Sequence, residues 1–460
     1  MPATLPSELL HAASRPGGRV ALVLGAGCST EGPTNLQLAS VYAESAYAEL
    51  VLDHVIAKGD CSAPGDLSAL ASAVYSATGS QVELVRRLPR NDFRLARPNL
   101  GYLIAAALLR EGVINAVLTL NFDLAMTAAL TELGAKQVAV VEGPTATSDL
   151  GQTTLIYLHR NANESNFESW ILRTEALEGE WEGGWEQVVV QRVLSCPVVV
   201  FAGLGSPAAA LTKTAERIRK AVASDQHHVC VVDPYPNSKF AQALDPPAQA
   251  YVEDGWGAFM QSLSDRYLQT VNATTEATCV DLCTRHGWPD ESTHAADACN
   301  RLHALGIVEL GRVRAQWLME SDAYVPDDTR RELIADLLLG IALVEQGCDV
   351  KASFHNDGLL HFQQASGATV RLRPASGRGT LRWSALEPLI LQSVKAMPRA
   401  GRPTHVLASG YVGGRPAVVP PDDLIEGDPS DDIIGGQAGP LILTVDEIRE
   451  EPALAARVVM

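Results

Sequence analysis

The stretch RVALVLGAGCSTEGPTN, residues 19–35, decides the fold that we predict for this chain. The apolar run Val20–Leu24 is typical of a buried strand, and it stops at the glycine turn 25–27. A helical pattern begins soon after, near Leu36. Glycines permit a sharp turn and a close approach to a ligand, and a helix start offers free N–H groups to a phosphate. The stretch therefore indicates either a nucleotide site or only a tight turn, and it lacks the full GxGxxG fingerprint.

Working outward, short apolar runs alternate with helical patterns as far as residue 235. The runs that we expect to be strands are Ile114–Leu120, Val138–Val141, Thr154–Leu158, Val198–Ala202 and His228–Val232. Helices are expected at residues 36–56, 67–78, 82–88, 100–112, 170–194, 211–223 and from 258 onward. This alternation predicts a Rossmann-like α/β fold, in which a parallel sheet carries helices on both faces.

Polar or glycine-rich residues follow five of the expected strands. These strand ends are GAGCS at 25–29, TLNFD at 119–123, LHRN at 158–161, GLGS at 203–206 and DP at 233–234. In parallel sheets, ligands bind beyond the carboxyl ends of the strands. Five such ends in one sheet favour a single ligand site over a simple turn.

Composition limits the classes of function. The chain has 460 residues, of which 47% are hydrophobic, and its net charge is −18. This length is typical of roughly two to four domains. The acidic balance gives no support for direct nucleic-acid binding, because phosphate backbones would be repelled. Eight scattered cysteines suit reduced thiols in a cytoplasmic protein, and we expect neither a signal peptide nor a membrane span.

Beyond residue 268 the pattern changes. Two short helices, Cys279–Arg285 and Ser292–Leu305, precede two short strands expected between Gly306 and Leu318. We interpret residues 269–325 as a winged-helix-like segment. Its helices are not basic, so packing or partner contact is favoured over DNA reading. The spacing Cys279-x3-Cys283 has no matched second pair, so it indicates core cysteines in preference to zinc ligands.

Residues 326–460 are predicted to form an α+β domain with a regulatory or partner-binding role. A long helix is expected at 327–347, a hairpin turn at Asn356-Asp357-Gly358 and a helix at 386–396. Strands are expected at 404–407 and around Val418, and a loop at 422–439. No motif in this region indicates catalysis.

The five strand ends, taken in order, resemble the motifs of the sirtuin (silent information regulator) family. GAGCS resembles that family's GAGxS opening, and residues 97–123 resemble its PN helix and T-x-N-x-D strand end. His159 corresponds to its LHG histidine, GLGS to its ribose loop, and residues 254–260 to its closing helix. The resemblance covers roughly residues 15 to 265 and assigns residues 1–268 to an NAD-binding and NAD-hydrolysing domain.

The resemblance implies that NAD binds as substrate and that its nicotinamide–ribose bond is cleaved, without a metal. The implied catalytic residues are Asn121, His159 and Asp123. The implied NAD-binding residues are Gly25, Ala26, Gly27, Ser29, Thr30, Gly203, Gly205, Ser206 and Asp233.

The implied residues suit this reaction chemically. Nicotinamide leaves as a neutral molecule, and the transition state resembles an oxocarbenium ion. The Asn121 amide can hold the ribose or the attacking water, and His159 can take a proton from a ribose hydroxyl or from water. Asp123 can orient either group, or it can simply cap the next helix.

Three departures from the family pattern bear on which reaction and which substrate are expected. Only Cys196 lies between His159 and Gly203, so the four-cysteine zinc module of protein-deacylating sirtuins is absent from the sequence and deacylation is not favoured. Arg160 replaces the glycine that follows the family's histidine. Residues 32–35, GPTN, replace the family's I-P-x-F-R segment.

The zinc-less branch of the family resembles bacterial NAD-consuming effectors of anti-phage defence. We therefore expect a regulated NAD glycohydrolase, controlled by homo-oligomerisation or by a partner protein encoded nearby. The alternative is a non-catalytic sensor or scaffold that binds NAD or ADP-ribose, an interpretation motivated by Arg160. Protein deacylation or ADP-ribosyl transfer is the least favoured.

Overall fold

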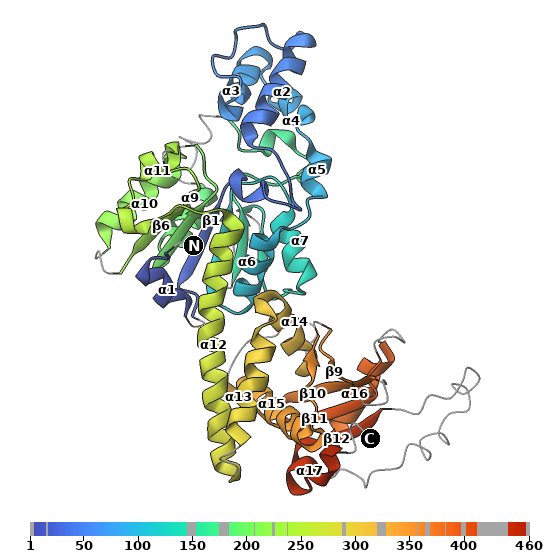
Figure 1. The fold of residues 1–460 in the computed structure, drawn as a ribbon. Coiled ribbons are helices and arrows are strands. Elements are labelled where there is room, and N and C mark those ends of the chain that lie inside the picture. Colours follow the sequence, from blue (N-terminus) through green and yellow to red (C-terminus); the bar gives the residue numbers. More distant parts are fainter. Residues whose placement is uncertain are drawn as a thin grey trace, which may run out of the picture. The chain divides into compact units, whose positions relative to one another are not determined.

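Strand β1 (Val20–Leu24) lies in the middle of a seven-stranded sheet, and all five of its residues are buried (Figure 1). The strand order is β3-β4-β2-β1-β5-β6-β7, and every pairing is parallel. The other strands are β2 (Ile114–Thr119), β3 (Ala139–Val141), β4 (Thr154–Tyr157), β5 (Val198–Ala202), β6 (His228–Val232) and β7 (Tyr251–Val252). The predicted Rossmann-like parallel sheet is confirmed.

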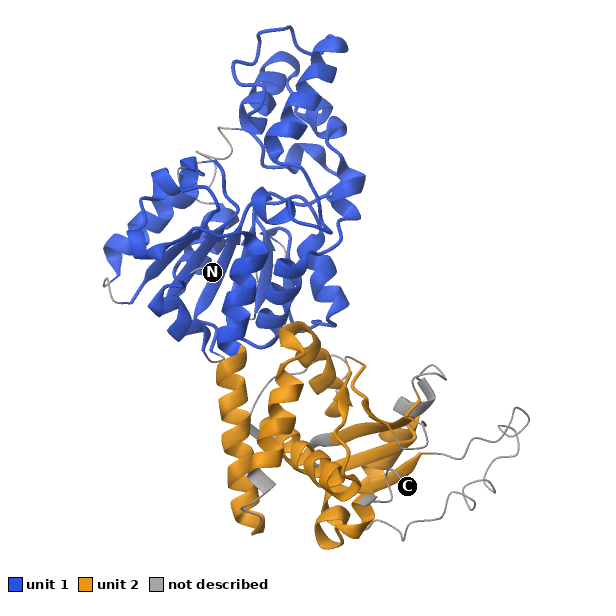
Figure 2. Ribbon diagram, viewed as in Figure 1, with its two compact units in different colours: residues 1–267 blue, residues 268–460 orange. Residues whose placement is uncertain are grey.

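The structure is a computed structural model. It describes residues 4–14, 17–144, 153–173, 184–206, 208–222, 226–236, 238–287, 291–319, 328–355, 357–363, 369–381, 383–396, 402–411 and 440–456. The chain divides into two units, Met1–Tyr267 and Leu268–Met460 (Figure 2). Helix α12 (Trp256–His286) runs from the first unit into the second. The predicted division at residues 268 and 325 into three functional parts stays a prediction.

Helices cover both faces of the first sheet. The described helices of this unit, besides α12, are α1 (Ser7–Ala13), α2 (Ala39–Leu52), α3 (Leu67–Thr78), α4 (Val82–Arg87), α5 (Arg90–Arg94), α6 (Leu100–Arg110), α7 (Ala125–Glu132), α9 (Trp185–Leu194), α10 (Ala209–Ala221) and α11 (Lys239–Leu244). Ala21 and Val23 of β1 share a buried core with α9, α10 and α11. Alternate strand residues point to opposite faces, so Leu22 and Leu24 face the other side, where α1 contacts β1 and α6 contacts β2.

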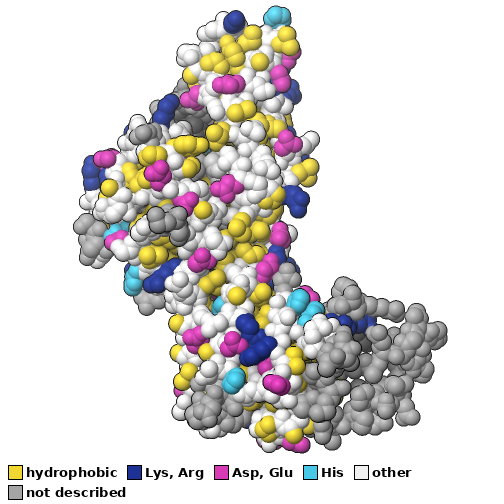
Figure 3. Space-filling view, in the orientation of Figure 1, with side chains coloured by type: hydrophobic (Ala, Val, Ile, Leu, Met, Phe, Trp, Pro, Cys, Tyr) yellow, Lys and Arg dark blue, Asp and Glu magenta, His cyan; other side chains and the backbone are white. Residues whose placement is uncertain are grey.

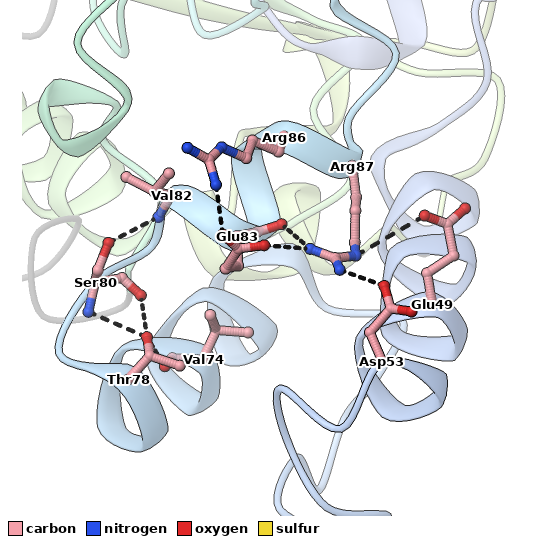
Figure 4. Close-up of polar contacts among 9 residues, drawn as sticks. All are labelled: Glu49, Asp53, Val74, Thr78, Ser80, Val82, Glu83, Arg86 and Arg87. Carbon is pink, nitrogen blue, oxygen red and sulfur yellow. Dashed lines mark hydrogen bonds and ion pairs between the residues drawn. The ribbon is translucent and has the colours of Figure 1, made fainter.

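Helices α2, α3 and α4 form a small helical group beyond the sheet (Figure 1). Arg87 on α4 joins this group together, because its guanidinium contacts Asp53, the residue that follows α2, and lies 2.9 Å from Glu83 Oε2 on α4 (Figure 4). The Arg87 side chain is only 13% exposed, which makes these ion pairs less screened than surface pairs.

The second unit contains a mixed five-stranded sheet in the order β12-β11-β10-β9-β8. Its strands are β8 (Ser353–Phe354), β9 (Leu360–Gln363), β10 (Thr369–Leu381), β11 (His405–Tyr411) and β12 (Leu441–Thr444). Its helices, besides α12, are α13 (Glu291–His303), α14 (Gly306–Trp317), α15 (Asp328–Cys348), α16 (Trp383–Ala396), α17 (Val445–Glu450) and α18 (Ala453–Ala456). Strands β8 and β9 pair antiparallel, and Asp357 and Gly358 of the predicted hairpin turn lie between them, whereas Asn356 lies outside the described residues.

Two secondary-structure predictions in this unit are wrong. The two strands expected between residues 306 and 318 are replaced by the single helix α14, so this segment does not form the wing of a winged helix. The short helix expected at 279–285 is the last part of the 31-residue helix α12. Along α14 buried apolar residues recur at helical spacing, and that packing overrides the local β-branched pattern. At residues 279–285 the predicted helix is present, but it begins earlier in the chain. Val418 and the loop predicted at 422–439 lie outside the described residues.

Acidic and basic side chains are interspersed over the visible face of the described residues (Figure 3). All eight cysteines are free thiols, and Cys348 alone among them is half-buried instead of buried. Among the described residues, no helix combines the length and the apolar character that a membrane-spanning segment requires.

Candidate active site

The five motif-bearing strand ends lie side by side at one edge of the first sheet. Backbone hydrogen bonds continue past the strands and hold each end to its neighbour. The bonds run from Leu158 N to Thr119 O (3.0 Å), from Leu120 N to Leu24 O (2.9 Å), from Gly25 N to Ala202 O (2.9 Å) and from Gly203 N to Val232 O (3.4 Å). The sequence motifs therefore meet at the carboxyl edge, where open α/β sheets bind ligands.

Three of the predicted glycines bring the ends of β1 and β5 into direct contact. A Cβ atom on Gly25 would lie 2.5 Å from the Gly203 carbonyl oxygen, and one on Gly27 would lie 2.8 Å from Gly203 Cα. Gly203 has a φ of +65°, and its own Cβ would lie 2.5 Å from the Cys28 amide nitrogen. These glycines are required for backbone packing whether or not a ligand binds.

Asn121 is held by its amide nitrogen. The Nδ2 atom lies 3.0 Å from the Gly25 carbonyl oxygen, 3.1 Å from the Tyr102 hydroxyl and 3.2 Å from Ser29 Oγ. Three acceptors thus compete for two N–H donors, and the side chain is fixed in one orientation. Its Oδ1 oxygen accepts no hydrogen bond from the described residues, so it is the part of Asn121 that a ligand can use.

Asp123 and Ser29 form the buried side of this network. Ser29 Oγ donates to Asp123 Oδ2 (2.7 Å), so the Tyr102 hydroxyl, also 2.7 Å away, is the donor toward Ser29. The other Asp123 oxygen accepts the Ala125 amide (3.0 Å) at the start of α7. Burial raises the pKa of Asp123 above its ordinary value. Asp123 therefore both caps α7 and anchors Ser29, which is only 2% exposed.

His159 follows β4 as Asn121 follows β2. Thr119 of β2 pairs in register with Tyr157 of β4. Asn121 comes two residues after Thr119, and His159 comes two residues after Tyr157. His159 is half-buried. Burial, reinforced by the positive charge of Arg160, lowers its pKa to about 4. Its imidazole is consequently neutral at physiological pH and able to accept a proton.

The remaining predicted residues line the edge between β1 and β6. The Gly27 amide donates to Gly203 O (2.9 Å), whereas the amides of Ala26, Gly205 and Ser206 have no acceptor among the described residues. Thr30 is exposed, with its hydroxyl on Gly27 O (2.9 Å). Asp233 is 6% exposed, and its Oδ1 accepts the Tyr235 amide (2.8 Å).

Two residues of this network are not predicted from the sequence. Tyr102 is expected only as part of an apolar helix, yet its hydroxyl contacts both Ser29 and Asn121. Asn99 caps that helix by accepting the Tyr102 amide (3.1 Å) and donates to Cys28 O (2.8 Å). A cap-forming asparagine three residues before a tyrosine was the available signal. In the part of the chain that the structure describes, no three His, Cys, Asp or Glu side chains gather so as to hold a metal.

Comparisons with known proteins give structural neighbours only. No protein-family model matches this chain, and no curated protein matches it significantly. Similar solved structures include a Sir2 enzyme studied for its mechanism and regulation (14% identity, TM-score 0.32, covering 57% of this chain and 98% of that one). Others are a Sir2 homolog in complex with NAD (14%, 0.33, 58% and 95%) and Sir2 bound to an acetylated peptide (15%, 0.32, 56% and 95%). Identities and TM-scores this low assign no activity to this chain.

Proposed function

We propose that this protein is an NAD hydrolase that converts NAD and water into nicotinamide, ADP-ribose and a proton. The proposal rests on one observation, which is the hydrogen bonding of Asn121 and the protonation of His159 at two neighbouring strand ends. Asn121 has both amide donors engaged within the protein and its Oδ1 oxygen available. His159 beside it is neutral, since burial lowers its pKa to about 4. Together they supply an acceptor that orients a hydroxyl and a base that takes a proton.

The reaction follows from this pair. The bond between ribose C1′ and the nicotinamide nitrogen breaks, and its electron pair leaves with nicotinamide as a neutral molecule. A water oxygen then bonds to the oxocarbenium-like C1′, oriented by Asn121 Oδ1, and its proton passes to His159. Because the leaving group is neutral, no general acid is needed.

The glycine turns form the proposed binding site of the dinucleotide. The available amides of Ala26, Gly205 and Ser206 suit the pyrophosphate and the ribose, and Asp233 is assigned to the adenosine side. In this proposal Gly25, Gly27 and Gly203 act through close backbone packing, while Ser29 and Asp123 hold Asn121 in place.

The biological setting is part of the proposal. Following the sirtuin-like motifs without a zinc module, we propose an effector of anti-phage defence that depletes cellular NAD. Such an enzyme must be inactive in a healthy cell. Residues 269–460, a nearby partner protein or assembly into a homo-oligomer are the proposed means of control.

The test measures cellular NAD before and after phage challenge in cells expressing the full chain with its flanking genes. We expect NAD to fall after challenge with the wild type and to hold steady with Asn121→Ala or His159→Ala. His54→Asn changes an exposed histidine and is the matched control, which should behave as wild type. Depletion that survives both site substitutions would refute the assignment.

A second candidate is a sensor that binds NAD or ADP-ribose without turnover, favoured by Arg160 in place of a glycine. It predicts protection of the culture with constant NAD, and NAD binding that His159→Ala leaves unchanged. Calorimetry with the purified chain distinguishes the two candidates.

A further inference from the structure

Arg160, directly after His159, has a backbone conformation that disfavours its own side chain. Its φ is +75°, in the left-handed region. An L-amino acid other than asparagine or aspartate is disfavoured in this region, because its Cβ atom comes too close to the following carbonyl oxygen. Such a residue persists only where the surrounding structure holds it in that conformation.

The Arg160 side chain turns onto the first turn of α9. Its Nη2 lies 3.5 Å from Glu186 Oε1, and its guanidinium carbon lies 5.4 Å from the centre of the Trp185 ring. Both ends of the ion pair are largely buried, with Arg160 15% and Glu186 11% exposed. At this burial an ion pair is weakly screened, and the stacking adds a cation–π attraction.

We propose that Arg160 is a positioning residue for His159. Its contact with Glu186 and Trp185, which we call the α9 clasp, fixes the turn that carries the imidazole. The clasp also keeps a positive charge beside the imidazole, so that His159 acts in its neutral form. The clasp deepens the proposed NAD hydrolysis and rests on it for its catalytic consequence. Its effects on the conformation of the turn and on the charge beside His159 do not depend on that reaction.

The other charged groups around this turn do not replace Arg160. Glu142 follows β3 and accepts a hydrogen bond from Asn161 Nδ2 (2.6 Å). Asp123 follows β2 and is engaged by Ser29 and the α7 start. Glu186 faces the guanidinium. Among the described residues, Arg160 is thus the cation that acts on His159, and its charge adds to burial in lowering the pKa of the imidazole.

The experiment titrates His159 in the full-length chain by NMR with histidine-selective labelling, and His159→Gln assigns the signal. Arg160→Gly removes the charge and suits a φ of +75°, so the backbone conformation is retained. Arg160→Gly/Glu186→Gln also removes the buried carboxylate that the single variant leaves unpaired. Arg160→Lys retains the charge, and Arg219→Ala, an exposed change on α10, is the matched control.

We expect the titration midpoint of His159 to rise by about half a unit or more in both glycine variants and to return toward wild type in Arg160→Lys. The acid limb of nicotinamide release should move to higher pH in parallel. A midpoint within experimental error of wild type in a folded Arg160→Gly protein would overturn the proposal.

The two proposals fail separately. If the wild type binds NAD but never releases nicotinamide under activating conditions, hydrolysis is refuted while the NMR titration still decides the role of Arg160. If nicotinamide is released with the same pH profile in wild type and Arg160→Gly, hydrolysis stands and the clasp is refuted.

Discussion

At the scale of single residues, the site depends on the direction of a few hydrogen bonds. Tyr102 donates to Ser29, Ser29 donates to Asp123, and Asn121 donates to the Tyr102 oxygen. The amide of Asn121 cannot flip without turning its Oδ1 oxygen toward the Gly25 carbonyl oxygen, which would leave that buried acceptor unpaired. Unpaired buried groups cost about 1–3 kcal/mol, which keeps the Oδ1 oxygen presented to a ligand.

We predict that Tyr102→Phe lowers NAD turnover by about tenfold to a hundredfold, because Asn121 and Ser29 lose a fixed partner and the reacting groups shift. Thermal unfolding and nicotinamide release measure both effects. Tyr157→Phe is the matched control, since its hydroxyl contacts Thr127 instead (2.8 Å). Both variants should lose about 1 kcal/mol of stability. Equal loss of turnover in the two would contradict the assigned role of Tyr102.

His159 also gives stability a pH dependence. Its pKa is about 4 in the folded chain and ordinarily 6.5, so between these values the unfolded chain binds a proton that the folded one does not. Stability therefore falls as pH drops from about 6.5 toward 4, on the order of 1–3 kcal/mol from this group. Urea unfolding at several pH values measures it. His159→Gln should lose less stability over that range than wild type, and a parallel loss would contradict the buried neutral state.

The sequence predicts some of these residues and not others. The positions of Asn121 and His159 at the edge of the sheet could be predicted because each follows an apolar strand, while their catalytic roles stay a prediction. Tyr102 could not, because an aromatic residue on an apolar helix face has no signal that separates core packing from hydrogen bonding. The left-handed backbone conformation of Arg160 could not be predicted either, because arginine, unlike glycine, has no preference for a positive φ.

At the scale of elements, strand ends β1 and β5 are joined by glycines, and this contact is testable. Gly203→Ala should destabilise the protein by about 2–4 kcal/mol, because a Cβ at φ +65° would lie 2.5 Å from the Cys28 nitrogen. In contrast, a Cβ on Gly205 meets nothing within 4 Å. Gly205→Ala should therefore unfold at the wild-type temperature in calorimetry. Comparable destabilisation by both substitutions would show that the close approach is not the cause.

Element prediction succeeded where periodicity and burial agree. β5 (Val198–Ala202) and β6 (His228–Val232) have the predicted bounds, because fully buried parallel strands are short continuous apolar runs. It failed at α14, where Ile307, Val308 and Val313 have β-branched side chains but lie along a helix with buried positions at helical spacing. Propensity alone cannot decide such a segment, since tertiary packing settles it.

At the scale of the whole molecule, every predicted site residue lies in the first unit. We predict that a fragment of residues 1–286 folds and binds NAD as tightly as the full chain does. The cut leaves α12 complete, which matters because Tyr267 is 1% exposed and its hydroxyl contacts Glu111 Oε2 (2.9 Å). Circular dichroism and calorimetry check the prediction. A folded fragment without NAD affinity would show that the second unit contributes to the site.

The central position of β1 has a consequence for how the protein is made. The ribosome synthesises Val20 178 residues before Val198, its partner on β5. At typical rates of translation that interval lasts on the order of ten seconds or more. During it, one edge of an entirely apolar strand has no partner strand in the nascent chain. Growing chains of this protein should therefore depend on chaperones until residue 202 has left the exit tunnel, and slowing translation between residues 120 and 198 should raise the fraction that aggregates.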